Sequence, residues 1–218
     1  MVANIAFNPY LQTNAAGQFT IESDGLVVGT AYPDPSTRFA LAGGWLATTE
    51  TLPMYGGIAI SELIPTERTT APATPTRADI ALGSVIARAT TLAAGAGSCT
   101  GFSVFDQNYA AVNTPTSPVP TVGSGGLVNF YRFGSGARVA LSADPALAAA
   151  IETGTSPVST PLYWDPTNLR VSATSTSNLL IPAKCLMVKG TNCMVASYNA
   201  GTGVTTWSYN GAAALVLL

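Results

Sequence analysis

Short apolar runs separated by turn-forming residues recur along most of the chain. The runs are rich in Val, Ile, Thr, Phe and Tyr, which favour strands, and the Gly, Pro and Asn between them favour turns. Turns about 8–12 residues apart are typical of antiparallel sandwiches and barrels. We therefore expect an all-β fold, an antiparallel β-sandwich or barrel of jelly-roll-like or β-tulip-like form, as one domain over residues 1–218.

Turn signals also predict which strands pair. Asp24-Gly25 predicts a two-residue hairpin, because both central positions of a type I′ turn need positive φ. Gly134-Ser135-Gly136 predicts a second hairpin, between strands at 127–133 and 137–142. The C-terminal quarter, 178–218, is expected to be a four-stranded antiparallel meander. Its turn signals lie at Gly190-Thr191-Asn192, Asn199 to Gly203 and Asn210-Gly211.

One short helix is expected after the second hairpin. Asp144 can cap its N-terminus, Pro145 suits its first position, and Gly154 suits its end. The run 80–95 fits either a strand or a helix, because its apolar residues do not follow one clear period.

Two segments rich in proline and threonine interrupt the strand pattern. Residues 64–79 are expected to form an extended arm or surface loop, and 113–126 a second Pro-rich loop. Arms of this length are unusual in a compact enzyme and suit a protein that reaches toward its neighbours.

Composition changes this picture by suggesting a covered surface. Only 9% of residues are charged and the net charge is −2, whereas a typical domain has about 25% charged residues. A free monomer normally relies on surface charge for solubility. The composition therefore favours an exterior largely covered by other protein, and the alternative is a secreted protein with a surface rich in Ser and Thr.

The distribution of charge and cysteine limits the partners and the compartment. The nine basic residues are scattered singly, so we expect no nucleic-acid partner. No apolar stretch approaches the roughly 20 residues of a membrane span, and the N-terminus lacks the pattern of a signal peptide. We therefore expect folding in a cytoplasm. Cys99, Cys185 and Cys193 are expected to be buried free thiols, with a Cys185–Cys193 disulfide across a hairpin as the alternative.

The residues needed for catalysis are mostly missing from the sequence. There is no histidine, which removes the commonest general base and the usual nucleophile triads. Glu50 and Glu62 are the acids we weigh as an unpaired-carboxylate hydrolase site, although nothing in the sequence selects them. The alternative is that the acids cap turns or lie on solvated strand edges. We expect no catalytic residue and no cofactor.

The glycine-rich segments and one acidic pair do not match known binding motifs. Residues 95–101 lack the glycine spacing of a dinucleotide fingerprint. Residues 122–126 lack the lysine of a Walker loop. The Gly-Gly pairs at 43–44 and 56–57 are interpreted as places where another part of the chain approaches the backbone closely. Asp106 and Asn108 match only the start of a calcium loop, so we expect no metal.

Several long strings resemble the structural cement, or capsid decoration, proteins of tailed bacteriophages. They are RFALAGGWLATTETLPMYGGIAISELIP (38–65), preceded by AFNPYLQTNAAGQFTIESDGLVVGTAYPDP, then GFSVFDQNYAAVNTPTSPVPTVGSGGLVNFYRFGSGARVALSADPAL (101–147) and MVASYNAGTGVTTWSYNGAAALVLL at the C-terminus. The similarity covers most of the chain and is weakest in the Thr/Pro arm and near 152–177.

This resemblance implies a β-rich, non-enzymatic protein on the outer face of a virion, made in the bacterial cytoplasm. Its partners would be the major capsid protein and neighbouring copies of itself, as a dimer or trimer, with no nucleic acid and no membrane. It would bridge neighbouring capsid subunits against the pressure of packaged DNA.

Residues 1–65 would then contain a capsid-contacting region. The candidate contact residues are Trp45, Pro53, Tyr55, Pro72, Pro75 and Pro118. Trp45 and Tyr55 also fit the core, because large aromatic residues serve both as core residues and as interface anchors. The alternative function is another virion surface component, such as a head fibre, tail protein or glycan-binding β module.

Overall fold

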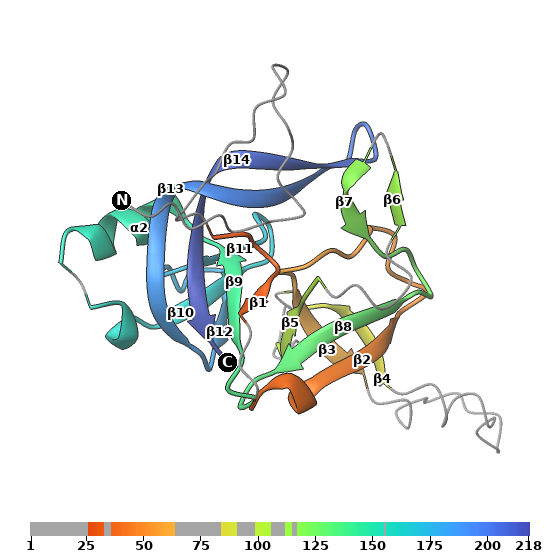
Figure 1. The fold of residues 1–218 in the computed structure, drawn as a ribbon, viewed down its shortest axis with the longest axis horizontal. Coiled ribbons are helices and arrows are strands. Elements are labelled where there is room, and N and C mark those ends of the chain that lie inside the picture. The colour runs from red at the N-terminus through yellow and green to blue at the C-terminus, as the bar shows by residue number, and fades with distance from the viewer. Residues whose placement is uncertain are drawn as a thin grey trace, which may run out of the picture.

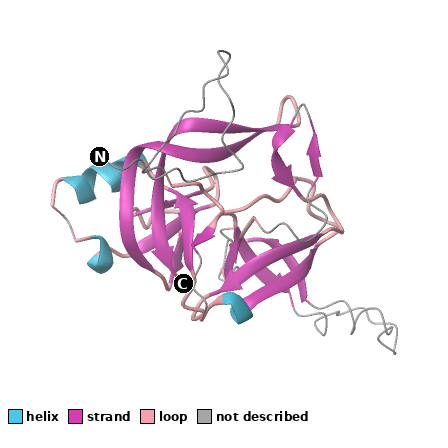
Figure 2. Ribbon diagram, in the orientation of Figure 1, coloured by secondary structure: helices cyan, strands magenta, loops and turns pink. Residues whose placement is uncertain are grey.

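The computed structural model describes residues 26–32, 36–63, 84–90, 99–105, 112–114, 117–154 and 156–218. Strands dominate these residues, which include one α-helix, α2 (Pro145–Glu152), and two short 3-10 helices, η1 (Arg38–Ala40) and η3 (Pro157–Ser159) (Figure 2). The expected all-β class with one short helix is therefore confirmed.

Five strands close into a small barrel (Figure 1). Their order around it is β2 (Leu41–Leu46), β4 (Ser84–Arg88), β3 (Ala59–Leu63), β5 (Gly101–Ser103) and β8 (Leu127–Arg132). β2 and β4 are parallel, and the other pairs are antiparallel. Ile60, Ile86 and Phe130 are fully buried in its core. β4 also settles the ambiguous run 80–95 as strand over Ser84–Arg88.

The glycines at 43–44 and 56–57 include two positions where a side chain has no room. A Cβ on Gly44 would lie 2.8 Å from the Ile86 side chain and from the Ser84 carbonyl on the neighbouring strand. A Cβ on Gly56 would lie 2.9 Å from the Gly29 Cα and would also meet the Phe105 ring. The interpretation of these glycines as points of close approach is confirmed at Gly44 and Gly56, but not at Gly43, where a Cβ would meet its nearest neighbours at an ordinary 3.6 Å.

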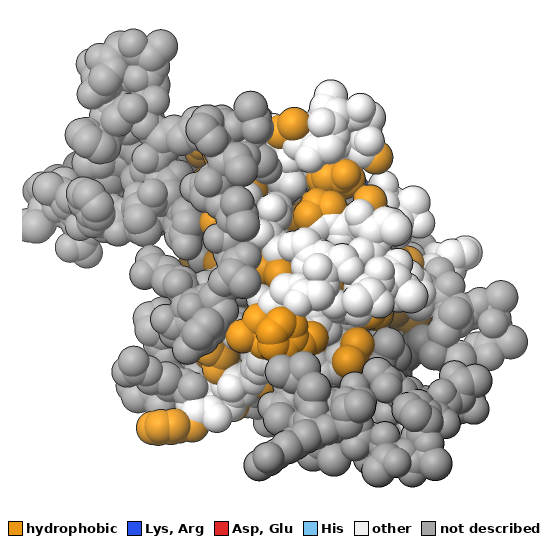
Figure 3. Space-filling model, turned by 90° about the vertical axis from the view of Figure 1, so that its right-hand side faces the viewer, with side chains coloured by type: hydrophobic (Ala, Val, Ile, Leu, Met, Phe, Trp, Pro, Cys, Tyr) orange, Lys and Arg blue, Asp and Glu red, His pale blue; other side chains and the backbone are white. Residues whose placement is uncertain are grey.

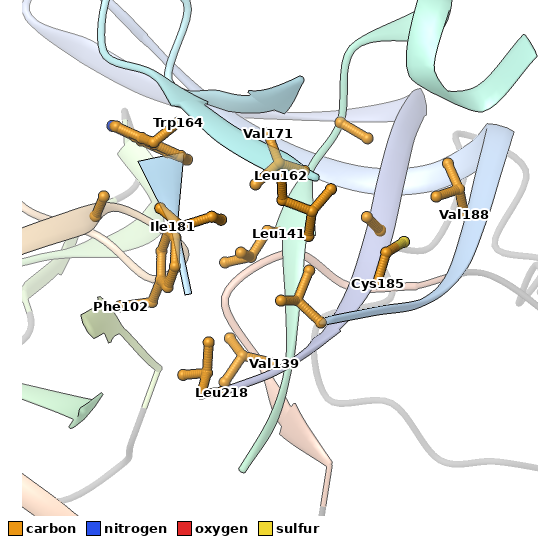
Figure 4. Close-up of a cluster of buried hydrophobic side chains, with 14 of the residues drawn as sticks. Phe102, Val139, Leu141, Leu162, Trp164, Val171, Ile181, Cys185, Val188 and Leu218 are labelled. Atoms are coloured by element: carbon orange, nitrogen blue, oxygen red, sulfur yellow. The ribbon is translucent and has the colours of Figure 1, made fainter. Parts of the chain in front are cut away.

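Two further sheets form the second part of the molecule. The first has the order β1 (Ala31–Tyr32), β9 (Arg138–Ser142), β14 (Val204–Leu217) and β13 (Lys184–Asn199), and the second has the order β11 (Arg170–Ser172), β10 (Leu162–Asp165) and β12 (Leu179–Ile181). All of their strand pairs are antiparallel. Trp164, Leu141 and Val171 are fully buried where the two sheets face each other (Figure 4).

The barrel and these sheets share a core. Phe102 of the barrel packs edge-on against Trp164 of β10, with ring centroids 5.5 Å apart. Both side chains are fully buried in one cluster with the sheet residue Leu141. This packing supports treating the described chain as one folded unit.

The helix begins and ends as its capping residues predict. The Asp144 side chain accepts a hydrogen bond from the Ala146 N–H at 3.0 Å, and Pro145 occupies the first position. Gly154 follows the helix with a φ of 113°, a conformation that favours glycine.

The predicted pairing around Gly134-Ser135-Gly136 is wrong. The turn exists, with positive φ at Gly134 and Gly136. However, the strand before it, β8, pairs with β2 and β5, and the strand after it, β9, pairs with β1 and β14. The turn therefore carries the chain from the barrel into the neighbouring sheet instead of closing a hairpin.

The predicted four-stranded C-terminal meander is also wrong. The region from Lys184 contains two long strands, β13 and β14, joined by a turn at the predicted position Asn199 to Gly203. The other two turn signals lie opposite each other in the ladder, where the register shifts around Cys193 and Gly211. Asn192 has a φ of 59°, and a Cβ on Gly211 would overlap the Val195 side chain. These residues bend the hairpin without reversing the chain.

The bend lets one hairpin contact both parts of the molecule. Residues 213–217 of β14, at the open end of the hairpin, pair with β9. The part nearer the tip lies against β7 (Ser117–Thr121) and the barrel core, where Ala196 joins the cluster of Ile60 and Phe130 (Figure 1). β7 pairs with β6 (Val112–Thr114), so two short strands occupy the predicted second Pro-rich loop. The Asp24-Gly25 turn, the arm 64–79 and the pair Asp106 and Asn108 lie outside the described residues.

Candidate binding surface

The two acids weighed as a hydrolase pair each bind an arginine. Glu50 accepts a hydrogen bond from the Arg88 backbone N–H at 3.0 Å, and its other carboxylate oxygen lies 3.9 Å from the Arg88 Nε. The Arg88 side chain is only 8% exposed and donates to the Pro53 carbonyl. Its guanidinium lies 6.0 Å from the centre of the Tyr55 ring. Burial lowers the pKa of Arg88, and these four residues together fix the loop after β2.

Glu62 belongs to a second ion pair, on the strand faces that carry the core residues Ile60 and Phe130 but closer to solvent. Arg132 donates to its two carboxylate oxygens at 2.6 and 2.7 Å, and Ser84 also donates to it. These hydrogen bonds, the one from Arg132 first, lower the pKa of Glu62. Glu62 on β3 and Arg132 on β8 thus join two strands that flank β5.

A third cluster holds the helix against the small sheet. Arg170 lies 3.4 Å from Asp144 and 3.7 Å from Asp165. Asp165 also accepts hydrogen bonds from the Thr167 and Asn168 backbones at 3.0 Å. The carboxylates in these three clusters therefore pair with arginines, and some of them also cap the helix or accept hydrogen bonds within a turn.

All three cysteines are free thiols, and Cys99 is half-buried whereas Cys185 and Cys193 are buried. Cys185 and Cys193 are free and buried on the same strand, so the alternative of a disulfide between them is wrong. Burial raises the pKa of Cys99 to about 12 and that of Cys185 to about 11. Such thiols contain almost no thiolate at neutral pH.

The candidate contact residues differ in how far they are buried. Trp45, Pro53 and Pro118 are half-buried, and each keeps part of its surface accessible. Tyr55 is only 5% exposed, which places it in the core, the second of the two roles considered for it. Pro72 and Pro75 lie outside the described residues.

Uncharged turns gather at one end of the molecule. The turn 123–126 is tied to the end of β2, because the Leu46 N–H donates to the Gly126 carbonyl at 2.9 Å and the Ser124 hydroxyl donates to the Ala47 carbonyl at 3.3 Å. β7 leads into this turn and lies along β14. The tip of the β13–β14 hairpin, 199–203, is closed by hydrogen bonds to Asn199.

We call this region the uncharged end and define it as residues 47–49, 51–53, 123–126 and 199–203. Most of these residues are exposed, and they are Thr, Ser, Gly, Ala, Asn, Leu and Pro. Figure 3 views the molecule from the side that carries β6 and β7, and its described atoms show hydrophobic and uncharged polar groups with no acidic or basic side chain. Glu50, the acid within the loop, is turned to buried Arg88.

The uncharged end was missed as a site because its residues carry no recognised motif. A signal for it was nevertheless present. Residues 107–131 and 190–218 contain no Asp, Glu, Lys or Arg, and they supply the turn, β7 and the bent hairpin. The long uncharged runs therefore converge at one place in the fold.

Among the described residues, no cluster of His, Cys, Asp and Glu could hold a metal ion, and no helix is long and apolar enough to cross a membrane. No protein-family model matches the chain, and no curated protein or solved structure is significantly similar to it.

Proposed function

We propose that the protein is a non-enzymatic cement protein of a tailed bacteriophage. It binds the outer face of the capsid and bridges neighbouring major capsid subunits, so that the DNA-filled head is stabilised. The sequence resemblance introduces this function, and the uncharged end is the structural observation that carries it.

An uncharged surface suits repeated binding to protein. Burying a charge at an interface costs free energy unless a well-placed partner compensates it. Thr, Ser, Gly and Ala at the uncharged end can be covered without that cost, and backbone groups in their turns can still form hydrogen bonds. Charged surfaces, in contrast, depend on matching charges and on salt.

Stabilisation of a shell follows from binding alone. A protein that binds the assembled lattice, but not its separated subunits, shifts the equilibrium toward the assembled state. Several weak contacts on one lattice add up, because the first contact holds the others at high effective concentration. The engagement of Glu50 and Glu62 by arginines supports a role without catalysis.

Particles made with and without this protein test the proposal. We expect particles that lack it to release DNA at a lower temperature, and the purified protein to bind them saturably and restore the higher temperature. Equal release temperatures would contradict the stabilising role. Density for the protein on a tail or fibre would instead support the alternative of another virion component.

A charge placed in the uncharged end tests the surface itself. Thr202→Glu puts a carboxylate on the exposed hairpin tip, and Thr176→Glu makes the same change on an exposed turn beside β12. We expect Thr202→Glu to weaken binding to undecorated particles about tenfold or more, and Thr176→Glu to bind as the wild type does. If both variants bind normally, the contact surface lies elsewhere although the function stands.

A further inference from the structure

Phe39 is the most exposed large apolar side chain among the described residues. It is 94% exposed, compared with 65% for Leu180 and 53% for Val158. Scattered apolar residues are normal on a surface, but they usually cover part of their area against the protein. Phe39 instead presents nearly its whole ring to solvent.

The backbone beneath this ring is well fixed. Phe39 is the central residue of η1, where the Ala40 N–H donates to the Thr37 carbonyl at 2.9 Å. Thr37 is only 5% exposed although it is polar. The next residue, Leu41, begins β2 and pairs with Tyr131 of β8. The ring is therefore displayed from an anchored turn, which lowers the entropy cost of using it in binding.

From this geometry we infer that Phe39 is an anchor that inserts into an apolar pocket of a capsid subunit. The inference rests on the proposed function and adds a second contact to it. η1 precedes one end of β2, and the uncharged end begins at the other (Figure 1). At about 3.3 Å per residue, the six residues of β2 separate the two by roughly 20 Å. Two separated contacts suit a protein that bridges subunits.

The size of this feature decides between a capsid subunit and a second copy of the chain. A phenylalanine buries at most about 150–250 Å², whereas a stable pair of proteins buries at least about 1,000 Å². Phe39 alone therefore does not hold a dimer together in solution. It fits a partner that is also bound elsewhere, where one well-packed aromatic residue can contribute much of the binding energy.

A lipid surface is the weaker match. Peripheral membrane binding usually needs an amphipathic helix with an apolar face and basic residues. η1 has three residues, which gives one apolar side chain and no continuous apolar face. A pocket in a protein is the chemistry that a single projecting ring fits.

Replacing Phe39 by alanine tests the inference, with Leu180→Ala as the matched control on β12. The assay is binding of purified protein to capsids isolated from the encoding phage grown without it. We expect Phe39→Ala to unfold at the wild-type temperature, because its ring packs against little, and to bind about 10- to 100-fold more weakly. Phe39→Met should recover part of the affinity, and Leu180→Ala should bind normally.

The other outcomes distinguish failure of the Phe39 anchor from failure of the proposed cement function. Normal binding by Phe39→Ala, or equal weakening by Leu180→Ala, would overturn the anchor while the cement function stands. A wild-type oligomer that dissociates on Phe39→Ala would assign the ring to self-association instead. Binding to vesicles of neutral or anionic phospholipid that is lost in Phe39→Ala would assign it to a membrane. Failure of the wild type to bind capsids would overturn both proposals.

Discussion

Glu50 and Glu62 each bind an arginine of the barrel, yet the two ion pairs have different surroundings. The Glu50–Arg88 pair is almost covered, with side chains 18% and 8% exposed, and its shortest charge-to-charge distance is 3.9 Å. In the Glu62–Arg132 pair the arginine is 50% exposed and the distance is 2.6 Å. The pair with the better geometry is thus the one nearer to water.

We therefore expect the Glu50–Arg88 pair, although its charged atoms lie farther apart, to contribute more to the stability of the fold. In water an ion pair contributes little, because solvent already stabilises both charges. Inside a protein a lost partner leaves the other charge without compensation. Arg88 also binds the Pro53 carbonyl and lies over Tyr55, so it supports the loop that carries part of the uncharged end. Arg132 mainly joins β3 and β8 at a position that is open to solvent.

Replacing each arginine by methionine should reveal this difference in the free energy of unfolding. Arg88→Met is expected to have the largest effect. Methionine fills part of the space but removes the positive charge beside Glu50 and the donor to the Pro53 carbonyl, while the Arg88 backbone N–H still donates to Glu50. We expect a loss of about 3–5 kcal/mol in the free energy of unfolding, measured by urea denaturation. The double variant Arg88→Met with Glu50→Gln should recover part of this loss, because it removes the unpaired charge. A loss below about 1 kcal/mol would show that the burial of this pair has no energetic consequence.

Arg132→Met supplies the other half of the comparison. Its guanidinium lies 5.2 Å from the centre of the Phe130 ring, and methionine keeps some of that apolar contact. We expect a loss of at most about 1 kcal/mol, which becomes smaller in 1 M salt because exposed charges are screened. A loss as large as that of Arg88→Met, or one unaffected by salt, would contradict the distinction between the two pairs.

The sequence predicted local structure better than it predicted which residues contact each other across the fold. The helix at Pro145 was found from its capping residue and its proline, because these signals act over a few residues. The partners of Glu50 and Glu62 lie 38 and 70 residues away, and no local pattern reports such distances. Sequence reasoning therefore could not tell a buried ion pair from a solvated acid.

Turn signals failed for a related physical reason. Glycine and asparagine allow positive φ, and the same freedom serves a tight turn, a bend in a long hairpin or a passage between sheets. At Asn199 to Gly203 the signal closes a hairpin, at Gly211 it bends one, and at Gly134 it connects two sheets. Which outcome occurs depends on the strands that pair on either side. The uncharged end could be foreseen in composition, but the bend that completes it could not.

The smallest expected effect is the pH dependence of the stability that the Glu62–Arg132 pair contributes. Hydrogen bonds from Arg132 and Ser84 hold the pKa of Glu62 below the ordinary glutamate value of 4.5. A carboxyl whose pKa is lower in the folded state stabilises that state above the unfolded value, and the contribution disappears as pH falls through the folded value. We therefore expect Glu62→Gln to be less stable than the wild type by up to about 1 kcal/mol at pH 7, and the difference to vanish below the folded pKa. Urea denaturation of both proteins from pH 7 to about pH 3 measures it. A difference that stays constant over that range would mean that the glutamate contributes by its shape and not by its charge.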